Sequence, residues 1–152
     1  MDELQQELRA AERAAAAPFV EDPRSQAWYP LFMAAFVTAL TAGPVLTVHG
    51  LGYLGFPLQA VALAAVAFYY ARHHERAGAV PRMRSAPPEV QRAYTLVLVG
   101  AVAGLGVSVL TWLVSGWPTG LAAVFVSSLA VAWLYERHLY PRALHLVQQR
   151  LA

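Results

Sequence analysis

The sequence predicts an all-α, polytopic membrane protein in which four transmembrane helices form two tandem hairpins. An N-terminal cytoplasmic helix and a C-terminal amphipathic helix are expected to flank them. Composition indicates the class, because 58% of the 152 residues are hydrophobic and 13% are charged, against about 45–50% and 25% in soluble proteins. The apolar residues fall into four long runs and the arginines lie between these runs. A chain of this length has room for one domain.

Residues 1–28 are predicted to form a cytoplasmic helix and a linker. Residues 2–16 are rich in helix formers, and their apolar face is mostly alanine, which would bind a membrane weakly. Charges continue as far as Arg24, and no short apolar region with a cleavage site follows them. We therefore expect the first span to be a retained anchor rather than a cleaved signal.

The predicted transmembrane domain covers residues 29–140. Each apolar run has roughly 17–21 residues without a charged side chain, enough to cross about 30 Å of hydrocarbon. A soluble bundle of buried helices is the alternative, and it is disfavoured because helices that are apolar on all faces are rarely stable in water. The predicted spans are about 29–48, 54–70, 94–114 and 119–135.

Charge distribution predicts the orientation. The loop at residues 72–92 holds five arginines and two glutamates, whereas the turns at 49–53 and 115–120 hold no Asp, Glu, Lys or Arg. By the positive-inside rule this loop and both termini are cytoplasmic. The basic residues are thus topology signals, and nucleic acid is not an expected partner.

Two similar stretches end the second and fourth spans. Residues 68–75 read FYYARHHE and residues 133–140 read WLYERHLY. Each combines interfacial aromatic rings with an arginine, as expected where a span meets water. A tandem duplication of the hairpin and convergent interface chemistry both explain the similarity.

Small residues recur at four-residue spacing in the spans. Such stripes let helix backbones approach closely in a membrane, within one bundle or between the chains of a dimer. Pro44 is expected to kink the first span. The predicted helix-packing residues are Ala35, Ala39, Gly43, Ala60, Ala64, Gly100, Gly104, Ala123 and Ser127.

Reactive side chains are scarce. The spans contain no ionisable residue that proton-coupled transport would use. Gln59, Thr38 and Thr41 form the candidate polar site, although a structural hydrogen bond is the favoured role of Gln59. Cysteine is absent and no catalytic motif occurs, so no catalytic residue is predicted and an enzyme is not expected.

Three histidines are candidate ligands for a metal or haem. His73, His74 and His138 end the second and fourth spans and would share one depth in a bundle. Because they lie beside arginines at the water boundary, an interfacial polar role is favoured, and no cofactor is predicted. Beyond them, residues 141–152 place Leu144 and Val147 at helical spacing, which predicts an amphipathic helix on the inner leaflet.

The N-terminal region also carries a resemblance. An Ala/Glu/Arg-rich helix, then Asp22, Pro23 and Arg24, an aromatic pair and a first span follow one another over about the first forty residues. This order resembles small uncharacterised four-helix integral membrane proteins of actinobacteria. The resemblance implies a bacterial plasma membrane, and it implies no activity.

The expected function is that of a non-enzymatic accessory or interaction subunit. Its partners would be the lipid bilayer and either a membrane or cytoplasmic protein or a second copy of the chain. A small transporter or channel for a neutral or apolar compound is the first alternative. A haem-binding redox subunit is the second.

Overall fold

The computed structural model describes residues 7, 10, 27–77 and 86–151, and every regular element among them is helical. Glu7 and Ala10 are helical and exposed, while the rest of the helix predicted at 2–16 lies outside the described residues. The elements are α2 (Tyr29–Val48), α3 (Gly52–Ala77), α4 (Pro88–Ser115), α5 (Trp117–Leu134), the π-helical turn η2 (Tyr135–Leu139) and α6 (Tyr140–Leu151).

The described part of the chain contains four helices long and apolar enough to cross a membrane, which confirms the predicted number of such helices. The helices α3 and α4 are longer than the predicted spans, because helix continues to Ala77 at one end and begins at Pro88 at the other. Arg, Glu and Gln are good helix formers, and proline suits a first turn. Much of the predicted loop at 72–92 is therefore helical.

Two glycines with positive φ reverse the chain. Gly50 has a φ of 78° between α2 and α3, and Gly116 has a φ of 89° between α4 and α5. A side chain at either position would strain the backbone. Below each turn the two helices pack against each other, α2 on α3 and α4 on α5.

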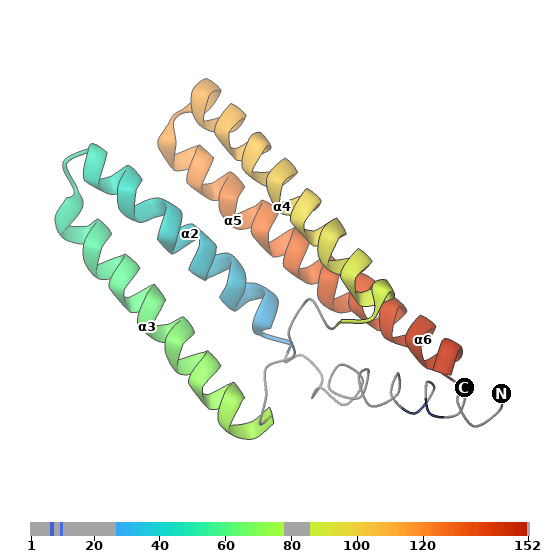
Figure 1. Cartoon of the computed structure of the whole chain (residues 1–152). Coiled ribbons are helices and arrows are strands. Elements are labelled where there is room, and N and C mark those ends of the chain that lie inside the picture. The colour runs from blue at the N-terminus through green and yellow to red at the C-terminus, as the bar shows by residue number, and fades with distance from the viewer. Residues whose placement is uncertain (1–6, 8–9, 11–26, 78–85, 152) are drawn as a thin grey trace.

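The four long helices lie in the order α3, α2, α5, α4 (Figure 1). In this row α2 packs on both α3 and α5, whereas α3 and α4 are the edge helices. The edge helices expose many large apolar side chains, among them Leu63 and Phe68 on α3 and Leu98 and Val102 on α4. A continuous apolar surface of this kind suits lipid or another protein rather than water.

We call the end of the row that carries Arg72, Arg92 and Arg137 the arginine end, and the end with Gly50 and Gly116 the turn end. At 28 residues α4 is about 42 Å long, which exceeds the roughly 30 Å of a hydrocarbon core. The segment α5–η2–α6 is longer still and runs in one direction beside α4 (Figure 1). Helix α4 and the segment α5–η2–α6 are therefore both longer than a hydrocarbon core is thick.

At the arginine end α6 packs on the start of α4. Ala143 and Val147 of α6 are buried against Ala86, Val90 and Ala93, with Tyr94 and Tyr135 beside them. We call this unit, residues 86–94 with η2 and α6, the stalk. The described residues of the segment 141–152 belong to the helix α6, whose apolar face covers α4, because α4 extends far enough to meet it.

Candidate functional site

The most specific polar contact inside the row joins α3 to α2. The Gln59 side chain donates a hydrogen bond from Nε2 to the backbone carbonyl oxygen of Leu40, at 3.0 Å. In an unbroken α-helix this carbonyl would accept the N–H of residue 44. Pro44 has no N–H, so Gln59 supplies the donor that the proline removes.

Two glycines bring the backbones close at this point. Gly43 and Gly55 are both buried, and a Cβ at Gly55 would lie 2.6 Å from the carbonyl oxygen of Gly43. A Cβ at Gly43 would overlap the Gln59 side chain. Gly55 is not among the predicted packing residues, although its position four residues before Gln59 places both on one face of α3. We call these residues, with Leu40 and Pro44, the proline junction.

A second close approach joins α4 to α5. A Cβ at Gly104 would lie 2.9 Å from the Ser127 Cβ, and one at Gly100 would lie 3.3 Å from Val131. The glycine pair thus lets α4 settle onto α5, as small residues do in membranes.

The predicted packing residues fall into two groups. Ala39, Gly43, Gly100, Gly104, Ala123 and Ser127 are buried or half-buried in the row. Ala35, Ala60 and Ala64 are exposed. On α3 the buried or half-buried positions include Gly55, Gln59, Ala62 and Val66. Ala60 and Ala64 therefore occupy a face that α2 leaves uncovered.

The structure does not gather the candidate polar residues into one site. The hydroxyls of Thr38 and Thr41 donate to the carbonyls of Ala34 and Val37, four residues back in α2, at 2.8 and 2.9 Å. Gln59 approaches α2 from α3, whereas Thr41 lines a cavity with α4 and α5. Each polar group is satisfied by helix backbone, which is the usual way to bury a hydroxyl in a helix.

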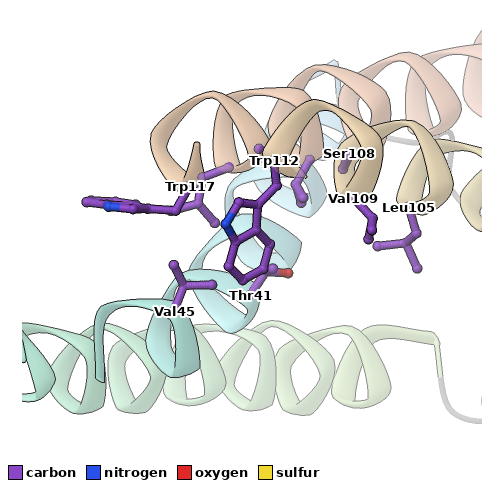
Figure 2. A pocket seen from close by; sticks show the side chains of 10 residues that line it. Thr41, Val45, Leu105, Ser108, Val109, Trp112 and Trp117 are labelled. Atoms are coloured by element: carbon purple, nitrogen blue, oxygen red, sulfur yellow. The ribbon is translucent and has the colours of Figure 1, made fainter. Parts of the chain in front are cut away.

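That cavity lies between α2, α4 and α5 near the turn end (Figure 2) and has a volume of about 70 Å³. Figure 2 shows the Trp112 ring between α4 and α2, above Thr41. The buried Ser108 hydroxyl donates to the Gly104 carbonyl at 2.8 Å, so it offers the cavity no free proton. Pockets for drug-sized molecules occupy about 300–1,000 Å³. A cavity of this size is either a gap in the packing or a space for a very small apolar solute. Its lining is Thr41, Val45, Leu105, Ser108, Val109, Trp112, Trp117, Gly120, Leu121 and Val124.

An aromatic pair joins the two hairpins above the cavity. The His49 ring stacks on the Trp117 ring, with 5.3 Å between their centroids. His49 follows α2 and Trp117 begins α5. Stacked rings of this kind stabilise a contact by roughly 0.5–1.5 kcal/mol, so the pair helps to fix one hairpin against the other.

The candidate histidine ligands lie on segments that do not pack together. His73 and His74 belong to the last turns of α3, and their side chains lie outside the described part of the structure. His138 belongs to η2, where its ring meets the edge of Trp133 at 5.3 Å. The helix α2 packs between α3 and α5. Among the described residues no group of three His, Cys, Asp or Glu could hold a metal ion.

The stalk adds a charged contact that the sequence analysis missed. Arg150 Nε lies 3.6 Å from Glu89 Oε1, while Glu89 Oε2 is buried without a hydrogen-bond partner. A buried carboxylate oxygen without a partner costs stability. The available signal was that apolar residues keep helical spacing beyond the spans, three residues apart at Val90 and Ala93 before the third span and four apart at Ala143 and Val147 after the fourth.

No family model, curated protein or solved structure matches this chain. The class of protein therefore rests on the fold: an all-α chain whose described residues include four helices able to cross a membrane.

Proposed function

We propose that the chain is a multi-pass protein of a bacterial plasma membrane that works as a non-enzymatic accessory or interaction subunit. The observation that supports this most is the open row of helices. Because α3 packs mainly on α2, its opposite face is free to meet another membrane helix. Ala60 and Ala64 give that face the small side chains that favour close helix packing.

The proposed orientation has the arginine end in the cytoplasm, together with both termini. Arg72, Arg92 and Arg137 are exposed at that end, whereas the turns at Gly50 and Gly116 carry no charged residue. Positive charge favours the cytoplasmic side. In this orientation the stalk faces cytoplasmic proteins and the edge helices face membrane proteins.

Site-specific photo-crosslinking in cells tests the partner. A photoreactive residue at Ala64 should give an adduct with one particular protein, identified by mass spectrometry. The matched control is Ala62, which is half-buried on the same helix and should give little adduct with other chains. An adduct with a second copy alone would replace the proposal by a homodimer. Lipid adducts alone from Ala64 would contradict it.

Two further functions remain proposals. The cavity between the hairpins would lie on the path of a small transporter or channel for a neutral or apolar compound. Flux into proteoliposomes across a compound panel tests this, and equal flux in empty liposomes would contradict it. A haem-binding redox subunit would use the interfacial histidines, and a visible spectrum without a Soret band would contradict that function.

A further inference from the structure

The apolar face of α6 suits two different surfaces. In the structure Ala143 and Val147 lie on Val90 and Ala93 of α4. The same face, with polar residues opposite, is typical of helices that lie on a lipid surface. The fully covered side chains of this contact are alanines and valines, which bury little area each, and the larger rings of Tyr94 and Tyr140 beside them are only partly buried. A lipid surface can therefore compete for this face.

The charge of this segment complements anionic lipid headgroups. Residues 137–151 contain three arginines and two histidines and no Asp or Glu. The side chains of Arg137 and Arg142 are exposed, so docking on α4 does not occupy them. Basic residues close to an anionic membrane surface gain free energy from it, and salt screens the attraction.

The docked position carries an electrostatic cost. Only one oxygen of Glu89 meets Arg150, at 3.6 Å, and the other is buried without a partner. Moving α6 away would return this carboxylate to water, which satisfies both oxygens. The ion pair therefore adds little net stability to the docked position of α6, because the cost of removing the carboxylate from water offsets much of the attraction.

The connection between α5 and α6 has the features of a hinge. At η2 the helix widens to a π-turn, in which the Tyr140 N–H bonds to the Tyr135 carbonyl. Pro141 follows and cannot donate the next helical hydrogen bond. Departures from regular α-helix of this kind are where helices bend. At 18 residues α5 is about 27 Å long, so the hinge falls near the edge of the hydrocarbon core.

We propose that α6 exchanges between the α4 surface and an anionic lipid surface, by bending at residues 135–141. The inference goes beyond the proposed interaction function, because it involves lipid alone and needs no protein partner.

Pulsed electron–electron spin resonance on the purified full chain tests the exchange. The chain has no cysteine, so labels attach only at Thr95→Cys on α4 and Gln148→Cys on α6, both exposed positions. The samples are nanodiscs of phosphatidylcholine and of an equal phosphatidylcholine–phosphatidylglycerol mixture. We expect one short distance in neutral lipid and a second, longer distance in the anionic mixture. Identical distributions in the two lipids would overturn the proposal.

Charge variants identify the cause. Arg142→Gln should lower the ratio of released to docked α6 about fivefold in the anionic mixture, the effect of one basic residue near such a surface. Arg72→Gln is the matched control, since Arg72 is an exposed arginine of α3 outside the stalk, and it should leave the ratio unchanged. An unchanged ratio in Arg142→Gln would overturn lipid charge as the driving force.

A separate label shows where the released helix goes. Leu144 is half-buried in the docked stalk. In the anionic mixture a spin label at Leu144→Cys should become accessible to oxygen dissolved in lipid. Accessibility only to a water-soluble nickel complex would mean that α6 unfolds into water, which overturns the proposal.

Discussion

Replacing Gln59 by methionine removes the hydrogen-bond donor of the proline junction and keeps a side chain of similar length. The Leu40 carbonyl then loses the group that bonds to it at 3.0 Å, and Pro44 cannot replace it. Hydrogen bonds between membrane helices contribute about 0.6 kcal/mol on average and up to about 1.7. Because the carbonyl is left without a partner, we expect a loss near the upper value, about 1–2 kcal/mol.

The explanation through Pro44 makes a stricter prediction. In a Pro44→Ala background, residue 44 has an N–H that can bond to the Leu40 carbonyl. Gln59→Met should then cost less, and the coupling between the two changes should be about 1 kcal/mol. The free energy of unfolding, measured by steric trapping in bicelles for both single variants and the double variant, gives this coupling.

Gln149→Met is the control, because Gln149 is exposed on α6, far along the chain from the junction. It should leave the stability of the row nearly unchanged. An equal cost of Gln59→Met with and without the proline would refute the reasoning, since Gln59 would then contribute independently of the missing N–H.

Three further perturbations follow from the packing. Gly55→Ala should destabilise the chain by about 1–3 kcal/mol, because its Cβ would lie against the α2 backbone. The control Gly106→Ala places a Cβ that meets nothing within 4 Å and should be neutral or stabilising by up to about 1 kcal/mol. The same unfolding assay compares the two variants. Trp117→Ala removes the ring on which His49 stacks. Amide hydrogen exchange should therefore speed up in the turn between α2 and α3, and unchanged exchange there would argue against the contact. Val147→Ala removes two methyl groups from a fully buried side chain and should speed exchange throughout α6 about tenfold or more; an effect confined to residue 147 would contradict cooperative docking.

The sequence predicted the four helices well because hydropathy and length depend on local composition alone. It did not predict their order, since small residues occur on several faces of each helix and each stripe could meet any other. Ala60 and Ala64 illustrate this: their spacing is the same as that of Gly100 and Gly104, yet only the glycine pair packs on another helix of the row.

The proline junction was within reach of the sequence. The sequence predicts a kink at Pro44 and a structural hydrogen bond from Gln59, and only their pairing is new. Pro44 lies seven residues before Leu51, in the turn, and Gln59 lies eight residues after it, so hairpin geometry puts them at nearly one depth. The stalk was harder to predict, because the apolar face of α6 fits a leaflet and a neighbouring helix equally well. The helix α6 meets α4 only because α4 is long enough to extend beside it.

The interaction function is tested most directly by the mass of the intact particle. The chain should be extracted from its native membrane in a mild detergent and analysed by native mass spectrometry. Our account predicts a particle heavier than the 16.5 kDa chain by the mass of a different protein, which is lost on substituting leucine at Ala60 and Ala64. A particle with the mass of the single chain and bound lipid would contradict it.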